Sequence, residues 1–169
     1  VVSKQKTIFI GDVNIHQNPS STELANIAIG VAQNAKKLGF IPKVAILSYS
    51  NFGNPSGSNT KTINECLKIL EDKKVSFEFD GEMTAEVALD YNLIKENYPF
   101  CKLSGPANVL IMPDLYSANI SFKLLQKMEN LSVIGPIMIG GNNPFQIVQM
   151  GASVSDIVNS ACISTYNSL

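Results

Sequence analysis

The sequence contains no arginine, because all thirteen of its basic residues are lysines. A planar guanidinium can hold a phosphate or a carboxylate through two parallel hydrogen bonds, whereas a lysine offers only a point charge. The net charge is -1, and 16% of the residues are charged against 45% that are hydrophobic. This balance excludes a surface built to bind nucleic acid and is typical of an ordinary soluble globular domain.

Cysteine and histidine are also scarce, and long apolar runs are missing. Cys66, Cys101 and Cys162 are widely spaced without a C-x-x-C pair, which argues against a disulfide framework or a zinc site and predicts buried free thiols in a reducing compartment. The single histidine, His16, has no catalytic triad order or second metal ligand near it, so we expect a loop role and no metal site. No run reaches the roughly 18 apolar residues of a membrane span, and the start lacks the order of a signal peptide. We expect a cytoplasmic protein.

Apolar runs alternate with segments of helical spacing along the 169 residues, a length that suits one domain. The runs predict strands at 6–13, 43–50, 75–83, 107–114 and 132–140. The helical spacing predicts helices at 18–39, 60–73, 84–98, 117–129 and 153–168. A strand followed by a helix, repeated about five times, predicts an α/β fold with a mainly parallel sheet and helices on both faces.

Several element ends are marked by specific residues. Ser20 and Glu23 form the S-x-x-E pattern of a capping box, and Gly39 can supply the left-handed residue that ends the same helix. Ser153 can cap the last helix. The alternation in 75–83 is typical of a half-buried or edge strand. The last helix carries an apolar stripe that we expect in a core or an interface, made by Val154, Ile157, Val158, Ala161 and Cys162.

Ligands of parallel sheets bind beyond the carboxyl ends of the strands, which here are followed by 11–12, 48–58, 113–114 and 140–149. The loop "SYSNFGNPSGSN" could hold an anion on its backbone N–H groups, although it matches neither G-x-G-x-x-G nor a Walker motif, and such loops are also common as simple connections. Four carboxylates near strand ends, Asp12, Asp80, Glu82 and Asp114, could serve acid–base chemistry or a hard metal, or could be caps and turns. The candidate ligand-binding residues are Ser48, Ser50, Asn51, Gly53, Ser56, Asp114 and Asn142.

The segments "DVNIHQNPSSTELANIAI", "VAILSYSNFG", "DGEM", "GPANVLIMPDLYSANISFKLLQ", "VIGPIMIGGNNP" and "MGASVSDIVN" together resemble the phosphate acetyltransferase family nearly end to end. The resemblance implies a fold similar to isocitrate and isopropylmalate dehydrogenases, with an acyl-CoA site between two α/β subdomains. Residues 1–169 would then be one acetyltransferase-like domain covering the second half of the family's length. The closer likeness is to the acetyltransferase-like domain at the carboxyl end of bacterial NADP-dependent malic enzymes, which share "LSxSNFG" and "DGEM".

The resemblance also assigns four site positions. Active family members carry a Ser-Arg pair before the glycine that matches Gly151, and here the pair is replaced by Gln149 and Met150. A family aspartate is kept as Asp156, and a family arginine falls at Lys127. Acetyl transfer between a thiol and phosphate needs a positioned base and concentrated positive charge. Without the serine and the arginines, we expect the fold to be kept and the transfer to be lost.

Three functions remain open at this point. The first is a regulatory and oligomerisation domain that senses acetyl-CoA in a malic enzyme, which converts malate to pyruvate and CO2. NADP and a divalent metal would then bind upstream domains of the same chain, this region would bind no cofactor, and the protein would form a homo-oligomer without nucleic-acid or membrane partners. The second is an active phosphate acetyl- or butyryltransferase using Asp156 and Lys127. The third is a stand-alone acyl-CoA- or nucleotide-binding module.

Overall fold

The computed structural model describes residues 1–55, 58–128, 131–141 and 143–167 of the chain. Its central sheet has four strands that all run parallel, in the order β1-β4-β2-β3. The strands are β1 (Phe9–Gly11), β2 (Lys43–Leu47), β3 (Glu78–Met83) and β4 (Val109–Ile111). The prediction of an α/β fold with a parallel sheet is confirmed, and β3 is an edge strand as its alternating pattern indicates.

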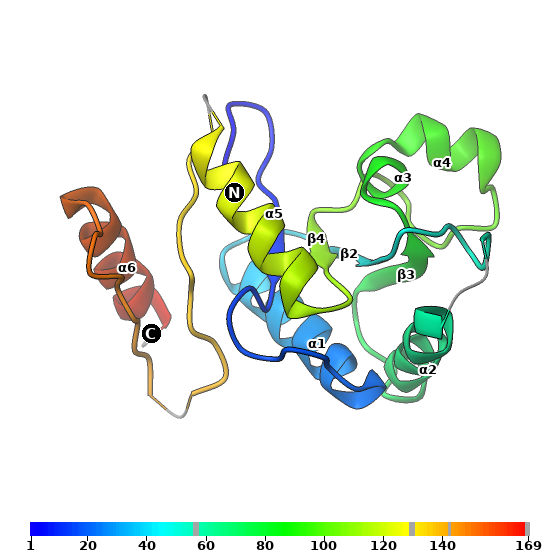
Figure 1. Cartoon of the computed structure of the whole chain (residues 1–169), viewed down its shortest axis with the longest axis horizontal. Helices are drawn as coiled ribbons and strands as arrows, with labels where there is room; N and C mark the ends of the chain where they lie inside the picture. Colours follow the sequence, from blue (N-terminus) through cyan, green and yellow to red (C-terminus); the bar gives the residue numbers. More distant parts are fainter. Residues whose placement is uncertain (56–57, 129–130, 142, 168–169) are drawn as a thin grey trace.

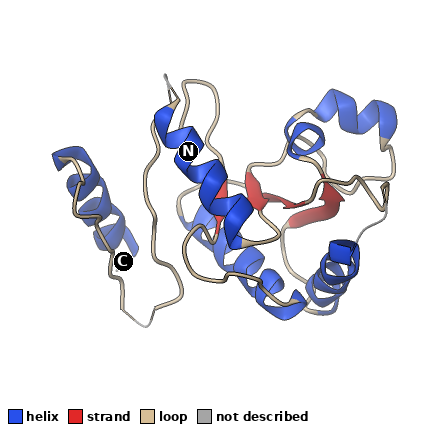
Figure 2. Ribbon diagram, in the orientation of Figure 1, coloured by secondary structure: helices blue, strands red, loops and turns tan. Residues whose placement is uncertain are grey.

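Helices cover both faces of the sheet (Figures 1 and 2). Successive residues of a strand point to opposite faces, so Val44 and Ile46 join the core beneath one helix layer while Ala45 and Leu47 join the core of the other. The first layer is α1 (Ser21–Lys37) and α2 (Ser58–Asp72). The second layer is α3 (Ala85–Leu89), α4 (Tyr91–Asn97) and α5 (Leu115–Lys127).

The predicted ends of α1 are confirmed in detail. The Ser20 backbone N–H donates to Glu23 Oε2 over 2.8 Å, and the Glu23 N–H donates to Ser20 Oγ over 3.3 Å, which completes the capping box. The Ser20 hydroxyl also donates to Glu23 Oε2, and the two hydrogen bonds from the Ser20 N–H and hydroxyl to this carboxylate lower the pKa of Glu23. Gly39 has a φ of +87° just beyond the helix, a conformation in which glycine carries no Cβ penalty.

Two predicted elements are wrong. The single helix expected at 84–98 is two short helices, because the Asp90 carboxylate accepts hydrogen bonds from the Asn92 and Leu93 N–H groups and starts a new helix there. The strand expected at 132–140 does not form. Apart from a bridge between Val2 and Ser132, that segment has no strand partner among the described residues, and a strand requires a neighbour for its ladder.

The last helix, α6 (Val154–Asn167), stands apart from the sheet at the end of an extended connection (Figure 1). A hydrogen bond from Tyr166 Oη to the Lys37 carbonyl, 2.7 Å long, ties its end to α1. Its predicted apolar stripe is exposed rather than buried, with Val154 78% exposed. Cys162 on this helix is exposed too, so the expectation of buried thiols holds for Cys66 and is wrong for Cys162. No described helix is long and apolar enough to cross a membrane.

Candidate functional site

Two of the predicted site carboxylates act as helix and turn caps. Asp114 Oδ1 accepts from the Ser117 N–H over 2.7 Å at the start of α5. Asp12 accepts from the Ile15 and His16 N–H groups, and its Oδ2 lies 2.5 Å from His16 Nδ1. Of these residues, Asp114 also lines a cavity of about 180 Å³ together with Asn18, Pro19, Leu24, Thr62, Ile63 and Pro113.

The strand-end loop, residues 48–55, packs against the end of β3. Ser50 Oγ and the Gly53 N–H both donate to Glu82 Oε1, over 2.6 Å and 3.1 Å, and Ser48 Oγ lies 3.1 Å from Ser50 Oγ. Asn51 Oδ1 accepts from the Thr84 N–H over 2.8 Å. Two donors of this loop, Ser50 Oγ and the Gly53 N–H, therefore have a partner inside the protein. Two further predicted ligand-binding residues, Ser56 and Asn142, lie outside the described residues.

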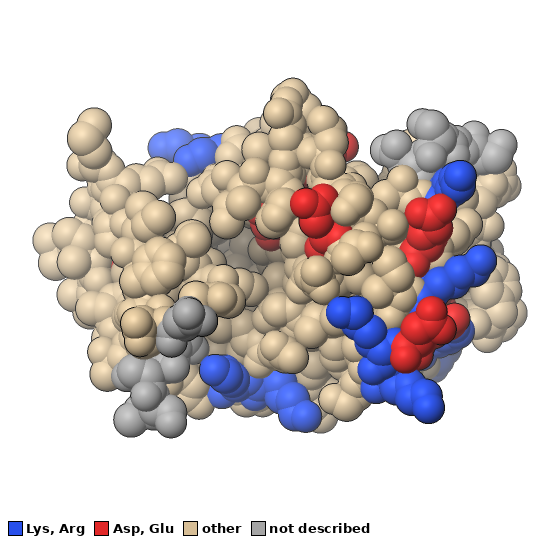
Figure 3. Space-filling view, turned by 90° about the horizontal axis from the view of Figure 1, so that it is seen from below, with Lys and Arg blue, Asp and Glu red and all other residues tan. Residues whose placement is uncertain are grey.

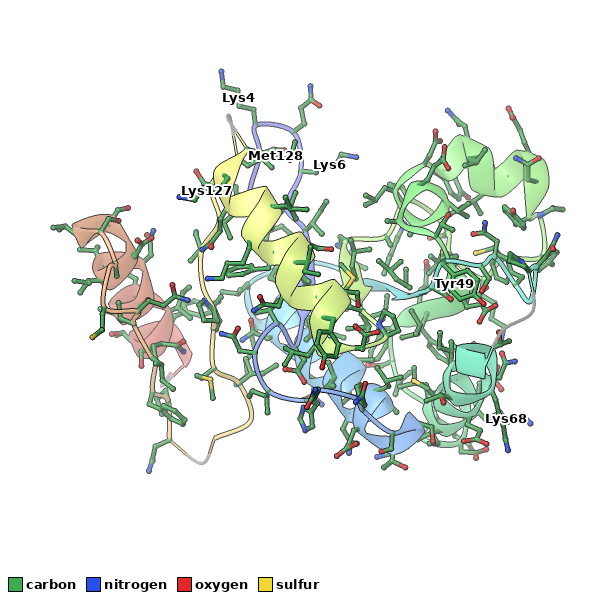
Figure 4. The ribbon with its side chains drawn as sticks, in the orientation of Figure 1. Lys4, Lys6, Tyr49, Lys68, Lys127 and Met128 are labelled. Atoms are coloured by element: carbon green, nitrogen blue, oxygen red, sulfur yellow. The ribbon has the colours of Figure 1, made fainter. Side chains whose placement is uncertain are left out.

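A larger cavity, of about 350 Å³, lies between the end of α5 and the start of α6; we call it the α5–α6 cavity. It brings together Lys127, Gln149 and Asp156, three of the four positions that the family resemblance indicated, from three separate parts of the chain. Figure 4 shows Lys127 leaving the end of α5. The other lining residues are Gln126, Val133, Ile134, Gly135, Pro136, Ile147, Val148, Gly151, Ala152 and Ser160. Met150, the fourth position, is fully exposed.

Asp156 is fixed by the residue that caps its helix. Ser153 donates to Asp156 Oδ2 from both its backbone N–H, over 2.9 Å, and its hydroxyl, over 2.8 Å. These hydrogen bonds lower the pKa of Asp156, because they stabilise the ionised carboxylate. The residues that line the cavity therefore include one anionic side chain, Asp156, and one cationic side chain, Lys127. An ionised and hydrogen-bonded carboxylate is a weak base, which limits proton abstraction by this group.

The effect of Ser153 on Asp156 can be measured directly. In Ser153→Ala, the titration midpoint of the Asp156 carboxyl should rise toward the ordinary range, because the hydroxyl donor is lost. The depressed pKa means that this pair stabilises the helix start above the ordinary pKa of aspartate, and that the stabilisation is lost as the pH falls through the lowered value. Carbon-detected NMR titration gives the midpoint. Ser155→Ala is the control, and equal midpoints in the two variants would contradict the assignment.

The sequence grouped these residues into one site, but the structure separates them into two. The strand-end loop rests on β3 at one edge of the sheet, while α5 packs on β1 at the other edge (Figure 1). Lys127 ends a helix that runs back from the carboxyl edge, so it lies away from that edge. Sequence reasoning did not identify Gln126 or Ser160 as lining residues, although Ser160 follows Asp156 by four positions and therefore shares its helix face.

Comparison with known proteins identifies this fold as that of a family of acyl-group transferases. Residues 1–165 match the family model described as phosphate acetyl/butaryl transferase, and the chain belongs to this family. It is 49% identical over 162 residues to the NADP-dependent malic enzyme of Rhizobium meliloti, covering 96% of this chain and 21% of that protein. It is 40% identical over 154 residues to the phosphate acetyltransferase of Helicobacter pylori, covering 91% of this chain and 30% of that protein.

Among solved structures, the EutD phosphotransacetylase from Staphylococcus aureus superposes with a TM-score of 0.90 at 29% identity, covering 99% of this chain and 52% of that chain. A phosphotransacetylase from Streptococcus pyogenes gives a TM-score of 0.87 at 31% identity, covering 94% and 48%. The chain thus spans about half the length of these structures and about a fifth of the malic enzyme. The likeness in fold to isocitrate and isopropylmalate dehydrogenases stays a prediction.

Proposed function

We propose that this chain is the regulatory and oligomerisation region of a longer, cytoplasmic NADP-dependent malic enzyme, and that it senses acetyl-CoA without transferring the acetyl group. The observation that carries the proposal is the α5–α6 cavity, which joins Lys127, Gln149 and Asp156 but contains no arginine. The similarity to the Rhizobium meliloti and Rickettsia prowazekii malic enzymes, at 49% and 46% identity, supports the identity of the parent chain.

The cavity suits binding better than acyl transfer. Its lining combines aliphatic side chains with amide, hydroxyl and backbone groups, and it carries one cation, Lys127, and one carboxylate, Asp156. Such a lining can bind a ligand through hydrogen bonds and a single contact with a cation. Transfer to phosphate would need a base and concentrated positive charge. Lys127 supplies one point charge, and Asp156 is held in its ionised form by Ser153.

The oligomerisation part of the proposal rests on two exposed apolar faces. Along α5 and its C-cap residue, four residues at intervals of four are each more than half exposed, namely Tyr116, Ile120, Leu124 and Met128. On α6, Val154, Ile157 and Val158 are each more than half exposed. Asp156 is the one charged residue of that helix, and the α6 end of the face in Figure 3 is mostly uncharged. Faces of this kind are typical of contacts with another subunit or with the rest of a longer chain. Sedimentation of a Leu124→Glu variant tests the subunit contact, since an unchanged oligomer would exclude this face.

The first experiment is malate-dependent reduction of NADP by the full-length protein, with and without acetyl-CoA. The acetyl-CoA response should need roughly tenfold more ligand in Lys127→Gln, because a hydrogen bond to a charged group is lost. Lys68→Gln, on α2, is the matched control, and Met150→Ala tests the one family position that does not line the cavity. Both should respond like the unmodified protein.

Each outcome discriminates between the functions. Equal responses in Lys127→Gln and Lys68→Gln would exclude the α5–α6 cavity as the effector site. If no malate is oxidised, the malic enzyme proposal fails. The alternative is then an active phosphate acetyl- or butyryltransferase, which the 40% identity to the Helicobacter pylori enzyme favours. Formation of acetyl phosphate from acetyl-CoA and phosphate is its direct assay.

A further inference from the structure

Glu82, near the end of β3, is a carboxylate buried inside the protein, with 1% of its surface exposed. Three donors converge on its Oε1 atom: Ser50 Oγ at 2.6 Å, the Gly53 N–H at 3.1 Å and Thr60 Oγ1 at 3.3 Å. Its Oε2 atom is equally buried and has no hydrogen-bond partner among the described residues. Glutamate is rarely buried without a charged partner, so this arrangement calls for an explanation.

The three donors are of the kind that binds an external anion. Hydroxyl groups and a backbone N–H that point at one position, in the loop between a strand and a helix, form an anion-binding concavity in many proteins. Here that position is filled by the protein's own carboxylate. We propose that Glu82 is the internal anion of the strand-end loop, and that it is the positioning residue that holds the loop closed against external phosphates and carboxylates.

The backbone around Glu82 supports this role. The Phe52 N–H donates to the Glu82 carbonyl over 2.7 Å, and the Ser48 N–H donates to the Met83 carbonyl over 2.9 Å. The main chain of the loop is therefore hydrogen-bonded to the main chain of Glu82 and Met83. Glu82 thus holds the loop through both its backbone carbonyl and its carboxylate. Gly53, whose N–H reaches Oε1, has a φ of +90°, which is unstrained only for glycine.

One consequence is that the loop and the α5–α6 cavity have separate tasks. An external anion could bind in the loop only by displacing the Glu82 side chain, which already accepts three hydrogen bonds. The loop therefore has a structural role. This inference does not depend on the proposed malic enzyme role, because the loop geometry is the same for a regulatory domain and for a transferase.

The test is rescue of Glu82→Ala by a small carboxylate, in the full-length protein. Glu82→Ala should lower Tm by roughly 10 °C, since three donors lose their acceptor and a void replaces the side chain. Sodium formate should then recover about half of this loss, and sodium chloride at equal ionic strength should recover none. Glu86→Ala, an exposed glutamate four residues further on, should respond equally to the two salts.

The proposal fails if Glu82→Ala unfolds at the temperature of the unmodified protein, or if formate stabilises it no more than it stabilises Glu86→Ala. Should Glu82→Ala not fold, Glu82→Gln is measured by amide hydrogen exchange. Because a neutral carbonyl is a weaker acceptor than a carboxylate, the Gly53 N–H should exchange at least about tenfold faster in Glu82→Gln than in the unmodified protein. An unchanged rate would show that the charge of Glu82 does not hold the loop.

Discussion

Gly81→Ala is expected to lower the free energy of unfolding by about 3 kcal/mol, at the upper end of the range for inserted atoms in a packed interior. A Cβ at Gly81 would lie 2.7 Å from the carbonyl oxygen of Ile46 and 3.0 Å from its Cβ. Ile46 belongs to the inner strand β2, and its backbone cannot move away without disturbing the pairing with β3 and β4. Chemical denaturation of the full chain measures the difference.

Gly105→Ala is the matched control for this prediction. Its added Cβ would also come close to another atom, but that atom is Lys43 Nζ, the far end of a flexible side chain that can rotate away. The loss of stability should therefore be less than about 1 kcal/mol. Equal losses in the two variants would mean that crowding against the β2 backbone is not the cause.

Leu24→Ala should destabilise the protein by about 2–5 kcal/mol, the usual cost of removing a large aliphatic side chain from a core. Leu24 is 1% exposed and belongs to the cluster that joins α1 and α2 to the sheet. Ile41→Ala removes a side chain of similar size that is 79% exposed, so it should change the unfolding free energy by less than about 0.5 kcal/mol. A similar loss in both variants would argue that burial at Leu24 is not what stabilises the helix layer.

The sequence predicted the elements whose partners lie within this chain. The uninterrupted apolar run at Val109–Ile111 forms the buried strand β4, and the Ser20 capping box starts α1. The segment 132–140 has an equally apolar pattern, but a strand also needs a neighbour, and no described residue beyond Val2 supplies one. Helical spacing alone does not predict the break at Asp90. That residue ends α3 and also begins α4, because its carboxylate accepts hydrogen bonds from two backbone N–H groups of α4.

The sequence does not predict how the candidate site residues lie relative to one another, for a physical reason. A strand-end rule selects residues at one edge of a sheet, but Lys127 stands at the far end of a helix and Asp156 on a helix apart from the sheet. Only the family resemblance connected these two, and the α5–α6 cavity contains both. The catalytic and binding roles of the individual residues stay predictions. Glu82 is one of the carboxylates that the sequence places near a strand end, and its burial at the end of β3 is what the structure adds.

The extended connection between α5 and α6 gives the cavity an entropic property. Lys127 precedes that connection in the sequence and Asp156 follows it, and both line the cavity. A molecule that contacts both residues therefore acts as a temporary crosslink and restricts the conformations open to the chain between them. Its affinity then depends on how freely the connection moves, as well as on the groups it contacts. A glycine or a proline substituted at a position of the connection that does not line the cavity should therefore shift binding in opposite directions through chain entropy.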